Sequence, residues 1–136
     1  MRVMAIDYGD ARTGVAVSDA MNFMAGDAFT VKSWNMDKAA AEIAEEAKRR
    51  DVGTIVVGHP LNMDGSAGER AEKCRDMANK LRELSGLDVV MWDERRTTVD
   101  AHRILHDNGK KMKDHRKSVD AVAATLILEG YLASLK

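Results

Sequence analysis

Four acidic residues stand where predicted strands end or a predicted helix begins. Asp7 follows the first apolar run, Asp93 and Glu94 follow the last predicted strand, and Asp120 lies in the first turn of the final predicted helix. If the fold brings these residues together, they offer the oxygen ligands that Mg²⁺ prefers. Two divalent ions about 4 Å apart can supply a nucleophilic water and neutralise the leaving oxygen in phosphodiester hydrolysis. Metal-dependent phosphodiester cleavage is therefore one hypothesis for this pattern.

Each acid also has a purely structural explanation. Asp is common in turns, and an acid in the first turn of a helix interacts favourably with the helix dipole. Because 32% of the residues are charged, some acids must fall near the ends of elements. Spacing alone leaves both interpretations open.

The predicted elements follow the periodicity of the apolar residues and the positions of turn residues. In chain order they begin with an antiparallel hairpin of strands 2–7 and 13–19, followed by a strand Ala28–Lys32 and a helix capped by Asp37 that ends near residues 51–53. A strand Thr54–Val57 then leads to a helix over 67–84 with Cys74 in the core, and a strand Asp88–Trp92 leads to a short helix capped by Thr97 or Thr98. The last helix is capped by Ser118, and its apolar residues recur at helical spacing: Val119, Val122, Ala123, Leu126 and Ile127. A hairpin followed by alternating strands and helices predicts an α/β fold, a mixed five-stranded sheet with helices on both faces.

Size and composition bound the class of protein. With 136 residues, of which 45% are hydrophobic, the chain is expected to form a single domain over residues 1–136. No apolar run is long enough to cross a membrane or to form a signal peptide, and the single cysteine cannot form an intramolecular disulfide. We therefore expect a cytoplasmic protein. Its net charge of −1 means that any site for nucleic acid must be local.

Four segments together resemble the signature segments of the YqgF/RuvX family. They are IDYGDARTGVAVSD, VVGHPLNMDGSAGER, WDERRTT and SVDAVAATLILEGYL, and they span nearly the whole chain in the order of the family. The resemblance implies an RNase H-like fold related to Holliday-junction resolvases. It also implies a hydrolase, a divalent-metal-dependent nuclease that matures the 5′ end of pre-16S rRNA in ribosome biogenesis.

The family pattern assigns catalytic roles to individual acids of this sequence. The first-strand acid is Asp7, the acid of the DER motif is Glu94 or its neighbour Asp93, and the helix acid is Asp120. Side chains alternate along a strand, so only one of Asp93 and Glu94 points towards Asp7, and we favour Glu94. The expected metal ligands are Asp7, Glu94 and Asp120, holding one or two Mg²⁺ or Mn²⁺ ions. The strand that ends in VVGHPLN carries no carboxylate, which leaves the number of ions open.

Several other residues could bind the substrate. Arg12 could bind a phosphate through its planar guanidinium, or it could form an ion pair with Asp10 or Asp19. Candidate contacts in the loop before the second helix are Asn62, Gly65 and Ser66, although Asp64 or Ser66 could simply cap that helix. The remaining candidates are Arg95, Arg96 and Thr97 after the DER acid, and Lys110, Lys111 and Lys113 in a basic run that could equally be a solvated loop.

Three functions remain open from the sequence. The first is cleavage of a structured RNA precursor, the second is resolution of four-way DNA junctions, and the third is nucleic-acid binding without catalysis. Junction cleavage would favour a symmetric homodimer that makes paired cuts, whereas RNA cleavage requires a surface that accepts an A-form helix.

Overall fold

The computed structural model describes residues 1–22, 24–61, 64–94 and 119–135. Its elements are β1 (Arg2–Asp7), β2 (Arg12–Ser18), β3 (Ala25–Lys32), α1 (Met36–Arg49), β4 (Val52–His59), α2 (Glu69–Ser85), β5 (Asp88–Asp93) and α4 (Val119–Ser134). The strands form one five-stranded sheet in the order β3-β2-β1-β4-β5. Strand β2 is antiparallel to β1 and to β3, whereas β1, β4 and β5 are parallel. The prediction of a mixed sheet with an N-terminal hairpin is confirmed.

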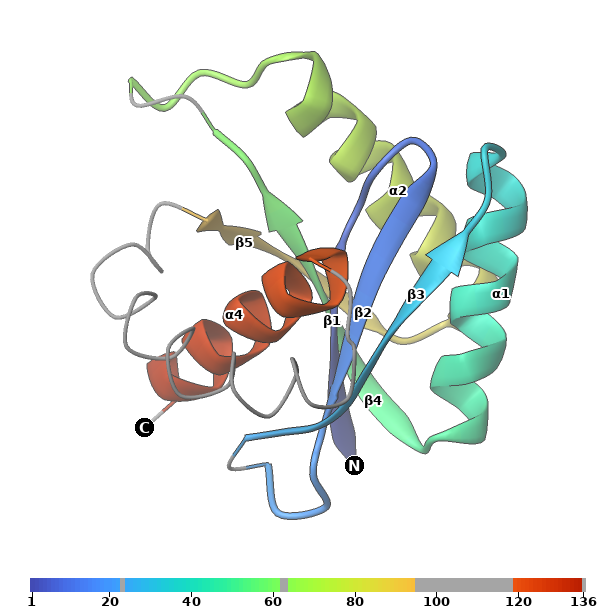
Figure 1. Ribbon diagram of the computed structural model, residues 1–136, viewed down its shortest axis with the longest axis vertical. Coiled ribbons are helices and arrows are strands. Elements are labelled where there is room, and N and C mark those ends of the chain that lie inside the picture. The colour runs from blue at the N-terminus through green and yellow to red at the C-terminus, as the bar shows by residue number, and fades with distance from the viewer. Residues whose placement is uncertain (23, 62–63, 95–118, 136) are drawn as a thin grey trace.

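Helices cover both faces of the sheet (Figure 1). On one face, α1 and α2 pack side by side over a core that includes Ile6, Val57 and Cys74. On the other face, α4 crosses β1 and β2 and encloses a second core with Ala5, Val56 and other residues of the alternate register. The alternation of side chains along each strand produces these two cores, because successive residues point to opposite faces. No helix among the described residues is long and apolar enough to cross a membrane.

The predicted cap of the first helix was wrong, whereas the predicted last helix is present, with only part of its apolar residues buried. Helix α1 is capped by Asn35, whose side chain accepts a hydrogen bond from the Lys38 N–H, and Asp37 lies within the first turn instead. Helix α4 buries Ala121, Thr125 and Leu128, whereas Val119 is exposed. Because α4 is apolar on nearly all sides, its sequence does not define one buried face.

Candidate active site

The carboxyl ends of four strands meet at one edge of the sheet. Strands β1, β4 and β5 are mutually parallel, and β3 runs in the same direction because two antiparallel pairings separate it from β1. The turn between β1 and β2 lies at this edge, as does the start of α2 (Figure 1). We call it the carboxyl edge. Ligand sites of open α/β sheets lie at the carboxyl ends of their parallel strands.

Asp7 and Glu94 lie on the same face of the sheet, the face that α4 covers. In β1, Ala5 belongs to the core under α4 and Ile6 to the opposite core, so alternation directs Asp7 towards α4. Glu94 follows β5, and its Oε1 lies 3.2 Å from the position that a Cβ would occupy on Gly58 of β4. The side chain of Ile127 from α4 lies at the same position. Glycine at position 58 thus makes room for the Glu94 carboxylate against the sheet.

The electrostatics of the two carboxylates are coupled. Burial, opposed by the Arg70 guanidinium and reinforced by Asp120, raises the pKa of Asp7 to about 6. Burial and the charge of Asp7, opposed by Arg70 and reinforced by Asp93, raise the pKa of Glu94 to about 6. Placing two acids in a partly desolvated site costs free energy at neutral pH, because both must carry charge there.

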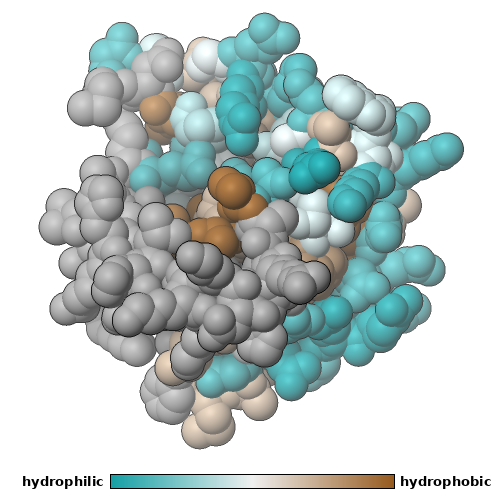
Figure 2. Space-filling model, in the orientation of Figure 1, coloured by the Kyte–Doolittle hydropathy of each residue, from teal (hydrophilic) through white to brown (hydrophobic). Residues whose placement is uncertain are grey.

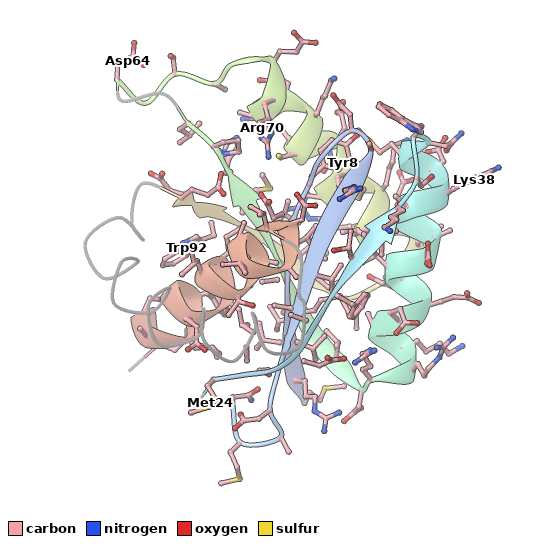
Figure 3. The ribbon with its side chains drawn as sticks, in the orientation of Figure 1. Tyr8, Met24, Lys38, Asp64, Arg70 and Trp92 are labelled. Carbon is pink, nitrogen blue, oxygen red and sulfur yellow. The ribbon has the colours of Figure 1, made fainter. Side chains whose placement is uncertain are left out.

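Arg70 is a functional candidate that the sequence reasoning missed. It lies in the first turn of α2, and its Nη2 donates a hydrogen bond of 3.1 Å to the carbonyl oxygen of Tyr8. The same nitrogen lies 3.7 Å from Oδ1 of Asp7. Figure 3 shows Arg70 next to the β1–β2 hairpin at the carboxyl edge. A cation in the first turn opposes the helix dipole, and this unfavourable placement is the sequence signal that could have identified it.

Asp120 reaches the site because the start of α4 packs directly on β2. A Cβ on Gly14 would overlap the backbone carbonyl of Asp120, so only glycine permits this approach. Gly14 pairs with Asp7 across the hairpin. The charge of Asp120 is close enough to raise the pKa of Asp7.

Asp93 lies on the opposite face of the sheet from Glu94. It pairs in register with His59 of β4, and its charge opposes the lowering of the His59 pKa that burial and Arg75 cause. Trp92, the residue before Asp93, packs in the core under α4, so strand alternation turns Asp93 to the other face. The structure therefore separates the two neighbouring acids, and Glu94 is the one near Asp7.

The candidate substrate-binding residues fall into two groups. Arg12 is exposed, and Asp10 binds Lys73 at 3.1 Å instead of pairing with Arg12. Gly65 and Ser66 are exposed in the loop before α2, where the Ser66 N–H and hydroxyl both donate to Asp64. Neither Asp64 nor Ser66 caps α2, because Gly68 is the N-cap and makes no side-chain cap hydrogen bond.

The other predicted contacts lie outside the described residues. They are Asn62, Arg95, Arg96, Thr97, Lys110, Lys111 and Lys113, together with the short helix predicted after Thr97 or Thr98 and the cap at Ser118.

Carboxylate oxygens are suitable ligands for a hard divalent cation, but the three acids do not form a single cluster around one ion position. Among the described residues, no group of three His, Cys, Asp or Glu side chains is placed to hold one ion. Asp7 and Glu94 lie close enough for the charge of Asp7 to raise the pKa of Glu94, and Asp120 lies close enough to raise the pKa of Asp7. Mg²⁺ is usually held by one or two carboxylates together with substrate phosphates and water, so this pair fits such an ion.

Solved structures define the class of fold. The RuvC structure from Thermus thermophilus in complex with Holliday junction substrate superposes with a TM-score of 0.68, at 15% identity, over 99% of this chain and 95% of that chain. The sheet order, the parallel strands and the helices on both faces are therefore those of the RuvC-like RNase H fold.

The family is more specific than the fold. The chain belongs to the RuvX family, because the family described as "RuvX: Holliday junction resolvase" matches residues 1–134. A relative from Ruminiclostridium cellulolyticum is 41% identical over 97% of this chain and 94% of its own length. Another, from Bacillus thuringiensis, is 41% identical over 98% of this chain and 99% of its own length. Both are named "Putative pre-16S rRNA nuclease". The predicted family and fold are confirmed.

Proposed function

We propose that this protein is a divalent-metal-dependent nuclease that cleaves the 5′ leader of pre-16S rRNA, with Asp7 and Glu94 as its central catalytic residues and Asp120 as their partner. The observation that carries the proposal is the pair of desolvated carboxylates on one face of the carboxyl edge. Its support from relatives is the nuclease name shared by proteins 41% identical over nearly the whole chain.

The burial of two coupled acids argues for catalysis over simple binding. A surface that only holds nucleic acid needs cations and has no use for carboxylates that repel phosphates. Here the charge of Asp7 makes Glu94 harder to ionise, yet both acids stand at the sheet edge. That cost is useful if the charges are neutralised when a cation and a phosphate enter.

The residues of the chain divide the work of such a reaction. Asp7 and Glu94 would hold Mg²⁺ or Mn²⁺, which when bound activates water and neutralises the leaving oxygen. Arg70 would bind a phosphate oxygen near Asp7, since its guanidinium already lies within 3.7 Å of that carboxylate. Its hydrogen bond to the Tyr8 carbonyl orients it towards the carboxyl edge. Arg12 would hold the neighbouring backbone of the substrate.

A second candidate function is resolution of four-way DNA junctions, and the description of the matching family favours it. We place it second because the full-length relatives at 41% identity carry the rRNA name, whereas the resolvase structure is 15% identical. Paired cuts in a junction would also require a symmetric dimer.

We propose further that residues 1–136 form one domain and that the enzyme acts in the cytoplasm, where ribosomal RNA precursors are processed.

The test compares three substrates with pure protein in Mg²⁺, in Mn²⁺ and in EDTA. They are the pre-16S 5′ leader RNA, single-stranded RNA of the same length, and a four-way DNA junction. We expect metal-dependent cleavage of the leader, and we expect Asp7→Asn to abolish it while folding and binding persist. The matched control is Asp88→Asn, an exposed acid at the amino end of β5. Cleavage by Asp7→Asn at the wild-type rate would refute the mechanism, and cleavage of the junction alone would select the second candidate.

A further inference from the structure

Trp34 is a large aromatic side chain held on the surface by an ordered turn. It is 84% exposed, whereas the other tryptophan, Trp92, is 5% exposed and packs edge-to-face on Tyr131. Hydrogen bonds fix the backbone on both sides of Trp34. The Asn35 N–H donates to Ser33 Oγ, and the Ser33 hydroxyl donates to the Asn35 carbonyl. The indole is therefore presented to solvent from a fixed position.

This position lies at the carboxyl edge. Trp34 comes two residues after the end of β3, whose carboxyl end points the same way as those of β1 and β4 (Figure 1). The Ser33 N–H donates to the carbonyl of Ala11, which ties the turn to the β1–β2 hairpin. Strand β3 is two strands away from β1, or about 10 Å across the sheet. A nucleic-acid strand bound at Asp7 would span this separation with a few nucleotides.

Two cations stand at the carboxyl edge, on the strands that separate β1 from the turn carrying Trp34. Arg12 and Lys32 are register partners on β2 and β3, and both side chains are exposed. They lie on the α4 face, because Gly14 two residues after Arg12 contacts the start of α4 and Ala28 four residues before Lys32 belongs to the core under α4. Neither side chain bonds to another described residue, since Asp10 is taken by Lys73. Hydrophilic side chains cover much of this part of the surface (Figure 2).

From this arrangement we infer that Trp34, Arg12 and Lys32 form a subsite for single-stranded nucleic acid that flanks the cut, with an unpaired base stacked on the Trp34 indole. The inference deepens the proposed nuclease function and rests on it in one respect, namely that the subsite lies beside the bond that is cut. Cations contact successive phosphates, and an aromatic face stacks on a base whatever its sequence. The bases of a continuous duplex are already stacked on one another, so a duplex offers Trp34 no base face. The substrate class is therefore a strand with unpaired nucleotides beside the scissile bond.

The test measures the affinity of the full chain for labelled RNA by fluorescence anisotropy in EDTA, where cleavage does not occur. The probes are single-stranded RNA, the same RNA with abasic residues, and a blunt duplex of equal length. Trp34→Ala should weaken binding of the single strand by about tenfold, and it should leave duplex binding unchanged. Trp34→Phe should retain most of the affinity. The matched control is Leu84→Ala, an exposed apolar residue near the end of α2.

Salt dependence tests the two cations separately. Removing one phosphate contact on a single strand should reduce the slope of log affinity against log salt by about 0.7, and we expect this for Arg12→Gln and for Lys32→Gln. Equal losses on single strand and duplex, or no loss with Trp34→Ala, would overturn the subsite.

Cleavage assays on the same variants separate the two proposals. If wild-type protein cleaves no substrate but Trp34→Ala still loses single-strand affinity, the nuclease proposal fails and the subsite stands. If wild-type protein cleaves RNA and Trp34→Ala binds and cleaves as well as wild type, the subsite fails and the nuclease stands.

Discussion

The two faces of the sheet differ in the side chains that they present near the carboxyl edge. Under α1 and α2 the apolar core is continuous from Val52 through Ile6 to Tyr8, with Cys74 so well buried that its pKa rises to about 12. Under α4 the apolar core gives way at the edge to Asp7 and Glu94. One face stabilises the fold, and the other keeps charged groups in a partly desolvated place.

The α4 face accommodates its acids through glycines. Gly14 lets the backbone of α4 approach β2, and Gly58 leaves space for Glu94. Glycine in the interior of a strand weakens the strand because it has no side chain to pack. On the α4 face, the strands are therefore locally less stable at the two positions where α4 or a carboxylate must approach the sheet closely.

Among the substitutions that compare the two faces, the largest difference is expected between Glu94 and Asp93, neighbouring acids at the end of β5 that lie on opposite faces of the sheet. Glu94→Gln should lower metal-dependent RNA cleavage by at least about 100-fold, because it removes a charged ligand beside Asp7. Asp93→Asn is the matched control, since its carboxylate faces His59 on the other side. It should change the cleavage rate by less than about fivefold. Equal losses in initial rate for the two variants would remove the distinction between the faces.

The second prediction concerns the contact that positions Asp120. Gly14→Ala should destabilise the protein by about 3 kcal/mol, because the added methyl group meets the Asp120 backbone, which cannot move without shifting α4. Gly53→Ala is the control, because the atoms nearest to a Cβ there are side-chain atoms of Met1 and not the backbone of a helix. It should cost less than about 1 kcal/mol. Urea unfolding measures both, and equal costs would show that the α4 contact is not special.

Much of the fold could be predicted because the signals were local. Short β-branched runs such as Thr54–Val57 and the turn residues around Gly9 identify the strands, although β4 extends to Val52–His59. The exact caps were harder to predict, since Asn35 and Asp37 are both good N-cap residues. The buried side of α4 could not be predicted, because its apolar side chains are spread around the helix instead of forming one stripe.

The site was predictable only in part, for a physical reason. Alternation at the end of β5 could be used to place Asp93 and Glu94 on opposite faces, since it depends only on neighbours in the sequence. The contacts of Arg70 with Tyr8 and Asp7 join residues that lie far apart in the sequence, and no periodicity encodes them. The role of Gly14 likewise depends on α4, at the other end of the chain. Family resemblance pointed to the acids and left their surroundings unspecified.

The third prediction concerns the pH dependence of the free energy of unfolding of the metal-free protein, which follows from the raised pKa values of the acids on the α4 face. The ordinary pKa values of these side chains, 3.8 for Asp7 and 4.5 for Glu94, rise to about 6 in the folded protein. The folded state therefore binds more protons than the unfolded state between about pH 4 and 6, so these groups make stability fall as pH rises through that window.

The measurement is the free energy of unfolding of wild type and Asp7→Asn at pH 4.5 and 7. We expect Asp7→Asn to be more stable than wild type at pH 7 by on the order of 2 kcal/mol, and the difference to shrink at pH 4.5. The difference between the proteins cancels the opposite contribution of His59, whose pKa is lowered. Addition of Mg²⁺ at pH 7 should stabilise wild type more than the variant. A pH-independent difference would contradict the coupling of Asp7 to its surroundings.

The smallest effect is expected from Arg70, which reaches the acids from α2 on the opposite face. Arg70→Gln should reduce cleavage by about 5- to 10-fold, comparable to losing about 1 kcal/mol of transition-state interaction. Because Arg70 lowers the pKa of Asp7, its loss raises that pKa further, and the loss of rate should be larger at pH 6 than at pH 8. Arg75→Gln is the control, since Arg75 pairs with Glu72 on the same helix. A pH–rate profile that merely scales down would assign Arg70 to substrate binding alone, whereas a shift to higher pH shows that it acts across the sheet edge on Asp7.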